Sequence, residues 1–147
     1  MLVVLDSNVL LLAIGAHSPL RKIWTSFLMG QFKIAVNEDI LKEYEEILQI
    51  HSAIGAAKIV IDIFEESPDV IYQRVSYHWD AIKKDRDDNK FFDVAVVSSV
   101  HYLVTNDKHF DEAKRLKFPK IHIIRSEEFM GILNDNNFDN PTLIEVS

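Results

Sequence analysis

Short apolar runs alternate along the chain with longer stretches of helical periodicity. Residues 2–5 form an apolar run that ends at Asp6, a pattern typical of a buried strand. Residues 70–77 predict a further strand, which we place at an edge of the sheet. Other strands are predicted over residues 32–36, 102–105 and 121–124.

The segments between these strands favour helices. Ser18 and Pro19 are typical of a helix start, Gly30 of a helix end, and Asn37 of a cap before the next helix. Further helices are predicted over residues 8–14, 52–66, 90–100, 108–116 and 127–133. Strands that alternate with helices indicate an α/β domain with a central, mainly parallel sheet. We expect one domain over residues 1–133 and a polar C-terminal tail over 134–147.

Composition and length fit a single globular domain. The 147 residues are 48% hydrophobic and 27% charged. The chain has no cysteine, which excludes disulfides and thiolate metal ligands and fits a reducing compartment. Asp6 and Asn8 interrupt the apolar N-terminus, so it predicts neither a signal peptide nor a membrane span. We therefore expect a cytoplasmic protein without membrane association.

The formal net charge is −7, which has the wrong sign for binding nucleic acid by a broad basic surface. A nuclease is less affected by this argument, because clustered acids can hold divalent cations that offset the charge of the phosphates. The positions of the acids therefore matter more than their number.

Four acids, far apart in sequence, are predicted at the carboxyl edge of the sheet, where open α/β sheets bind ligands. Asp6 follows the first strand, and Asp107 follows the strand that ends at residue 105. Glu43 lies one turn into the helix after the second strand, and Asp88 begins the buried helix. Crowded carboxylates repel one another unless a cation is present, and oxygen ligands suit Mg²⁺ or Mn²⁺.

Each acid also has a purely structural explanation. Asp6 and Asp107 are placed to cap helices, and Asp88 to interact with a helix dipole. Glu43 and Glu45 stand at opposite margins of one apolar stripe, so helical periodicity does not choose between them.

Four motifs together resemble those of PIN domains. They are Leu2-Val-Val-Leu-Asp-Ser-Asn-Val9, Glu38-Asp-Ile-Leu-Lys-Glu-Tyr-Glu-Glu-Ile-Leu48, Asp85-Arg-Asp-Asp-Asn-Lys-Phe-Phe-Asp-Val-Ala95 and Tyr102-Leu-Val-Thr-Asn-Asp-Lys-His-Phe110. The first is similar to the Asp-[Ser/Thr]-Asn opening of the family, and the second places its glutamate at Glu43. The third acid is Asp88 or, one turn further along the helix, Asp93. Asn89 occupies a position that is sometimes acidic in the family. Relatives sometimes use a further acid at the position of Asp111.

This resemblance implies a three-layer α/β/α fold and a metal-dependent endoribonuclease, the toxin of a toxin–antitoxin pair similar to VapC. It implies one or two Mg²⁺ or Mn²⁺ ions, an RNA substrate, a cognate antitoxin protein and a homodimer. The implied catalytic and metal-binding residues are Asp6, Glu43, Asp88 and Asp107. Supporting positions are Asn8 and Thr105, which we expect to hydrogen-bond the carboxylates, and Asn89, Asp93 and Asp111. Lys90, Lys108 and Arg115 are candidates for binding phosphates.

Two other functions are weighed against this one. A non-catalytic PIN-like module would bind RNA or a protein without cleaving it. A phosphohydrolase of the haloacid dehalogenase type needs a second aspartate two residues after the first, where this chain has Asn8. His109 is expected at the surface, and the histidine spacing does not predict a zinc site. The phenylalanines at positions 91, 92, 110, 118 and 129 are expected in the core rather than on a base-stacking surface.

Overall fold

The computed structural model describes residues 1–83 and 86–138. Its described strands form one five-stranded sheet in the order β3-β2-β1-β4-β5, and every neighbouring pair is parallel. The strands are β1 (Leu2–Leu5), β2 (Lys33–Val36), β3 (Val70–Tyr72), β4 (Tyr102–Val104) and β5 (Ile123–Ile124). This arrangement confirms the predicted parallel sheet and places β1 at its centre.

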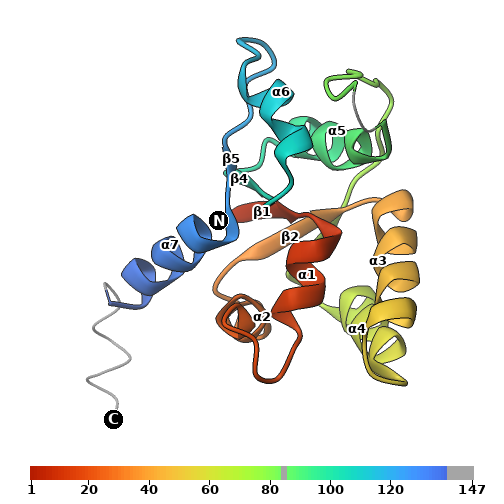
Figure 1. Cartoon of the computed structure of the whole chain (residues 1–147), viewed down its shortest axis with the longest axis vertical. Coiled ribbons are helices and arrows are strands. Elements are labelled where there is room, and N and C mark those ends of the chain that lie inside the picture. The colour runs from red at the N-terminus through yellow and green to blue at the C-terminus, as the bar shows by residue number, and fades with distance from the viewer. Residues whose placement is uncertain (84–85, 139–147) are drawn as a thin grey trace.

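Helices cover both faces of the sheet, which confirms the predicted three-layer fold. Figure 1 shows α5 and α6 above the sheet and α1 and α2 below it, and α3 packs against α1 and α4. The helices are α1 (Ser7–Ala13), α2 (Arg21–Leu28), α3 (Glu38–His51), α4 (Ala56–Glu66), α5 (Asn89–Val97), α6 (Asp111–Lys114) and α7 (Ser126–Phe138). Short 3-10 turns, Arg86–Asp88 and Lys108–Phe110, precede α5 and α6.

The core lies between these layers and is rich in aromatic rings. Phe27 and Phe64 meet edge to face, with ring centroids 5.6 Å apart, and Phe32 meets Phe129 in the same way at 5.1 Å. Four of the five phenylalanines predicted in the core are completely buried: Phe91, Phe92, Phe110 and Phe129. The prediction was wrong for Phe118, which is 81% exposed. It lies in the connection between α6 and β5, where no helix or strand directs it inward.

Several predicted boundaries also differ from the structure. The edge strand β3 ends at Tyr72, because its partner β2 ends at Val36, opposite that residue. Ser18 and Pro19 form a turn before α2 rather than its first residues, and the Ser18 hydroxyl accepts the Leu20 N–H. Helix α7 runs to Phe138 instead of ending at residue 133. The remainder of the predicted tail, 139–147, lies outside the described residues.

The order of the strands locates the candidate site. From β1 the chain proceeds to β2 and β3 on one side, whereas β4 and β5 lie on the other side. Ligands of open α/β sheets bind at the carboxyl ends of the strands where this order reverses. Here the reversal falls between β1 and β4, and the Asp6 N–H extends their pairing by donating to the Val104 carbonyl over 3.0 Å.

Candidate active site

Asp6 and Asp107 are joined at the ends of β1 and β4 by the Thr105 side chain. The Thr105 hydroxyl donates to Asp6 Oδ2 over 2.8 Å and accepts the Asp107 N–H over 3.0 Å. Both Asp6 and Thr105 are buried. Thr105 therefore lies where the sequence predicted carboxylate support, and it fixes one oxygen of Asp6.

Glu43 reaches the same region from α3. Asn37 caps this helix, as predicted, by accepting the Ile40 N–H over 2.9 Å. The Ser7 hydroxyl donates to Glu43 Oε2, and Lys90 Nζ lies 2.7 Å from Glu43 Oε1. Glu45 is exposed on the other side of the helix. The structure thus brings Glu43, and not Glu45, to the other acids.

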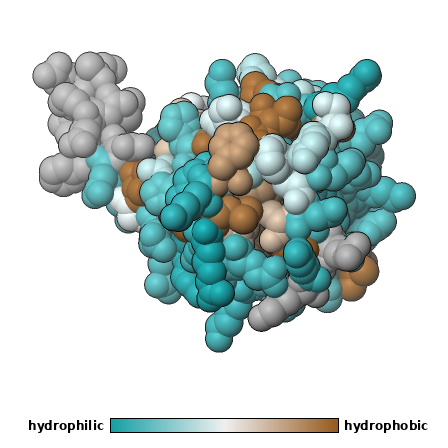
Figure 2. All heavy atoms as spheres, turned by 90° about the horizontal axis from the view of Figure 1, so that it is seen from above, coloured by the Kyte–Doolittle hydropathy of each residue, from teal (hydrophilic) through white to brown (hydrophobic). Residues whose placement is uncertain are grey.

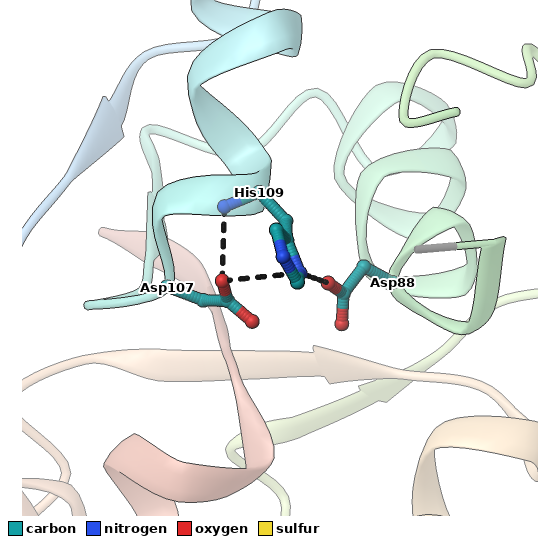
Figure 3. Close-up of side chains that lie close together, drawn as sticks. All are labelled: Asp88, Asp107 and His109. Atoms are coloured by element: carbon teal, nitrogen blue, oxygen red, sulfur yellow. Dashed lines mark hydrogen bonds and ion pairs between the residues drawn. The ribbon is translucent and has the colours of Figure 1, made fainter. Parts of the chain in front are cut away.

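Asp88 approaches Asp107 across the ring of His109. The His109 N–H donates to Asp107 Oδ1 over 2.9 Å, so Asp107 caps the 3-10 turn that carries this histidine. His109 Nδ1 lies 3.4 Å from Asp107 Oδ1 and 3.9 Å from Asp88 Oδ2. Figure 3 shows the imidazole between the two carboxylates. One potential ligand atom from each of these residues lies within 4.8 Å of the others.

The crowding of acids has an electrostatic consequence at Asp6. Burial, together with the charges of Glu43 and Asp107, raises the pKa of the Asp6 carboxyl from 3.8 to about 6, although the Thr105 hydrogen bond opposes the shift. Tyr44 is fully buried beside these acids, and its hydroxyl donates to the Leu5 carbonyl. Burial and the charges of Asp6 and Glu43 raise the Tyr44 pKa well above its ordinary value, so this phenol stays a neutral donor.

Other predicted site residues have structural partners instead. Asn89 holds both backbone groups of Ile82, accepting its N–H over 2.8 Å and donating to its carbonyl over 2.9 Å. The buried Asp93 accepts the Trp79 N–H over 3.1 Å and contacts His78 Nδ1 at 3.2 Å. These partners explain both buried side chains without a ligand. Of the two positions weighed for the third acid, it is Asp88 that lies beside Asp107.

The remaining predicted residues lie at the surface. Asp111 is half-exposed and pairs with Lys114 at 3.5 Å, and Asn8, Lys108 and Arg115 are exposed. Lys90 was predicted to bind phosphate, whereas the structure pairs it with Glu43.

Three residues beside the acids were not predicted to contribute. Ser7 sits within the Asp-Ser-Asn motif, yet the hydroxyl of Ser7, rather than the side chain of Asn8, contacts Glu43. Tyr44 appeared only as part of an apolar stripe. His109 is exposed, as expected, yet its ring also lies between Asp107 and Asp88, and its position two residues after Asp107 was the available signal.

A cavity of about 540 Å³ lies on the α3 side of the site, and of the four acids it is Glu43 that lines it. Glu43 and Lys90 line one part of it, and His78 and Asp80 line another. The cavity therefore reaches Glu43, and its far wall is the connection between β3 and α5.

A divalent cation fits the donor set. Asp88, Asp107 and His109 each offer one ligand atom within 4.8 Å of the others. Asp6 lies near enough to Asp107 and Glu43 for their charges to raise its pKa. Burial is the main cause of the raised pKa of Asp6, and the charges of Glu43 and Asp107 add to it; a bound cation would offset both. Carboxylate oxygens suit Mg²⁺ or Mn²⁺.

The doubly wound sheet with acids at its carboxyl edge defines an α/β protein with a candidate cation site. Residues 2–109 match the family profile described as PIN domain. The chain belongs to the PIN domain family. This membership decides against a haloacid dehalogenase-type phosphohydrolase.

Solved structures share the fold at low sequence identity. A chain of the VapBC2 complex from Rickettsia felis, solved with a DNA fragment from its promoter, is 18% identical with a TM-score of 0.59. The alignment covers 85% of this chain and 98% of that one. VapC20 from Mycobacterium tuberculosis, a toxin that cleaves the sarcin-ricin loop, is 14% identical with a TM-score of 0.55. This second alignment covers 78% of this chain and 97% of VapC20.

The curated proteins yielded no sequence match. In the described part of the chain, no helix is long and apolar enough to span a membrane.

Proposed function

We propose that this protein is a metal-dependent endoribonuclease that hydrolyses RNA phosphodiester bonds. The observation that carries the proposal is the convergence of Asp6, Glu43, Asp88 and Asp107 at the carboxyl ends of β1 and β4 in a PIN domain. Acids with only structural roles have no reason to gather at one edge of the sheet, where burial and neighbouring charges raise the pKa of Asp6. A non-catalytic binding module would not need this arrangement either.

Asp6, Asp88 and Asp107 would hold one or two Mg²⁺ or Mn²⁺ ions, with Glu43 directly or through water. Such an ion supplies positive charge at the scissile phosphate and acidifies water. Within the chain, Thr105 orients Asp6, and Ser7 with Lys90 orients Glu43. Asp6 is only 5% exposed, and one of its carboxylate oxygens accepts the Thr105 hydrogen bond.

Cleavage of labelled single-stranded and structured RNA in Mg²⁺, Mn²⁺ or EDTA tests this proposal. We expect cleavage in either metal, none in EDTA, and loss of cleavage in the Asp107→Asn variant. Asp62→Asn is the matched control, because Asp62 is an exposed aspartate on α4 that pairs with Lys58 and has no proposed part in the site. Equal cleavage by the wild type and a folded Asp107→Asn preparation would overturn the proposal.

We further propose that the chain acts as the toxin of a toxin–antitoxin pair. VapC20 is described as a toxin, and the VapBC2 complex shares the fold, which supports this role. A cognate antitoxin would block the acids, for example by bringing an arginine to them. Induced expression should arrest growth with the wild type but not with Asp107→Asn, and growth arrest by both would contradict the role.

A homodimer is also proposed, through the surface near α4. Ile59 is 62% exposed there, whereas Trp24 on α2 is only 5% exposed and belongs to the core. Light scattering of the wild type and Ile59→Asp distinguishes the states: a dimer that the substitution separates supports this surface, and an unaffected dimer contradicts it.

A further inference from the structure

An exposed aromatic group is formed by Tyr77, Trp79 and Phe118, and we call it the aromatic platform. The Tyr77 and Trp79 ring centroids lie 4.7 Å apart, and those of Trp79 and Phe118 lie 5.8 Å apart. Tyr77 is 63% and Phe118 81% exposed, and Trp79 is partly buried. Three aromatic rings from two distant segments thus lie together at the surface, whereas the other phenylalanines that were predicted in the core are buried.

Figure 2 looks onto the side of the molecule that carries α5 and α6. Hydrophobic and weakly polar side chains gather in its middle, with strongly hydrophilic side chains directly beside them. The surface is therefore mixed, with an apolar centre and a charged border.

The segment that carries Tyr77 and Trp79 is fixed to α5 and α6. Asp93 accepts the Trp79 N–H, Asn89 holds both backbone groups of Ile82, and Glu112 accepts the Lys83 N–H over 3.0 Å. Two of the side chains that make these contacts, Asp93 and Asn89, are buried. The platform is consequently preorganised, which reduces the entropic cost of binding a ligand on it.

Basic residues flank Phe118 along the sequence of this acidic protein. The stretch from Ala113 to Arg125 contains no aspartate or glutamate. Its cations are Lys114, Arg115, Lys117, Lys120 and Arg125. Among the described residues, no ion pair involves Arg115 or Lys117, whereas Lys114 pairs with Asp111. The chain thus concentrates 5 of its 16 lysines and arginines beside one exposed aromatic ring.

The aromatic platform borders the catalytic cavity. His78 and Asp80 line the cavity beside Glu43 and Lys90. Tyr77 and Trp79 are the chain neighbours of His78, and Trp79 also precedes Asp80, so the platform adjoins the cavity wall that these residues form. Asp93, which anchors Trp79, is five residues from Asp88, or about 7–8 Å along the axis of α5.

We propose that the aromatic platform and the basic stretch 113–125 bind single-stranded RNA outside the catalytic cavity and direct it to the acids. Unpaired bases stack on aromatic rings whatever their sequence, while cations follow the phosphates. An apolar protein partner would not require the five cations, and a duplex would not expose base faces to the rings. The proposal deepens the proposed function, because it rests on RNA being the substrate.

Binding of a fluorescein-labelled, single-stranded RNA in EDTA tests this proposal without cleavage. Phe118→Ala and Phe118→Leu should weaken binding by about 5- to 100-fold, as expected for a lost stacking contact, whereas Phe118→Tyr should bind within about 2-fold of the wild type. Phe118→Leu is informative because leucine keeps the apolar surface and removes the ring. Lys117→Ala should make the plot of log affinity against log salt concentration less steep, by about 0.7 in slope.

Matched controls lie away from this surface. Met29→Ala removes another exposed apolar side chain, and Lys33→Ala removes another exposed cation. Both variants should bind RNA like the wild type. RNA should also quench Trp79 fluorescence, and Trp79→Phe should remove that quenching, because the other tryptophan, Trp24, is buried.

The outcomes separate this proposal from the nuclease proposal. Wild-type affinity in Phe118→Leu overturns the platform, even if RNA is cleaved. Platform-dependent binding without cleavage in any metal supports the platform and overturns the nuclease. Binding that is equally weak in all variants overturns the platform and leaves a protein as the partner of this surface.

Discussion

The substitution Asp6→Asn is expected to stabilise the metal-free protein near neutral pH. Asp6 is only 5% exposed, and its pKa is about 6 in the folded state against 3.8 in the unfolded reference. Below pH 3.8 the carboxyl is protonated in both states. As the pH rises from there through 6, only the unfolded state releases the proton readily, so the free energy of unfolding decreases.

The size of this effect follows from the two pKa values. At about 1.36 kcal/mol per pKa unit, ionised Asp6 costs the folded state about 3 kcal/mol above pH 6. Asparagine avoids this cost but accepts a weaker hydrogen bond from Thr105, a loss of about 1 kcal/mol. We therefore expect a net gain of about 2 kcal/mol, or roughly 4–8 °C in Tm.

Urea unfolding in EDTA at pH 4.5 and pH 8 measures the difference. The gain should be about 2 kcal/mol at pH 8 and close to zero at pH 4.5. At pH 4.5, about 0.7 units above the unfolded pKa of 3.8, the cost is only about 1 kcal/mol, which the weaker hydrogen bond of asparagine offsets. Glu45→Gln, an exposed acid on α3, should change stability by less than about 0.5 kcal/mol at both pH values. An Asp6→Asn variant that is less stable than the wild type at pH 8, or equally shifted at both pH values, would refute the reasoning.

Further substitutions test the contacts around the acids. Ser7→Ala removes the hydrogen bond to Glu43 and should cost about 1 kcal/mol in urea unfolding, whereas Asn8→Ala at the exposed neighbouring position should cost less than about 0.5 kcal/mol. Lys90→Gln removes the cation beside Glu43, so Mg²⁺ should raise the Tm of this variant more than that of the wild type; an equal rise would contradict this. Tyr44→Phe leaves the Leu5 carbonyl unpaired and should cost about 1–3 kcal/mol in urea unfolding, and an unchanged stability would contradict this contact.

Much of the fold follows from local patterns in the sequence. The runs that end at Leu5 and Val104 are completely apolar because both strands are buried on two sides, and this makes them easy to recognise. The edge strand was predicted too long, because its end depends on where β2 ends and not on its own residues.

The candidate site could be predicted in part. Asp6 and Asp107 follow strands directly, so the topology places them. The choice of Glu43 over Glu45 depends on tertiary contacts with Ser7 and Lys90 that helical periodicity does not contain. Asp93 resembled a ligand by spacing, yet it anchors the Trp79 segment, a role that only long-range contacts reveal.

The sequence did not predict that Phe118 is exposed either. An isolated phenylalanine between short elements is usually buried. Here α6 ends at Lys114, and the following connection turns the ring toward Trp79 at the surface.

The central claim, that the converging acids catalyse RNA cleavage, is tested most directly by the single-turnover cleavage rate of Asp6→Asn in Mg²⁺ at pH 7.5. Because this variant is expected to be more stable than the wild type without metal, a loss of cleavage would come from lost catalysis and not from unfolding. Substitutions of residues that only orient metal ligands cost about 10–100-fold in activity, so loss of a ligand should cost about 100-fold or more. Cleavage at the wild-type rate by folded, contaminant-free Asp6→Asn would contradict the account.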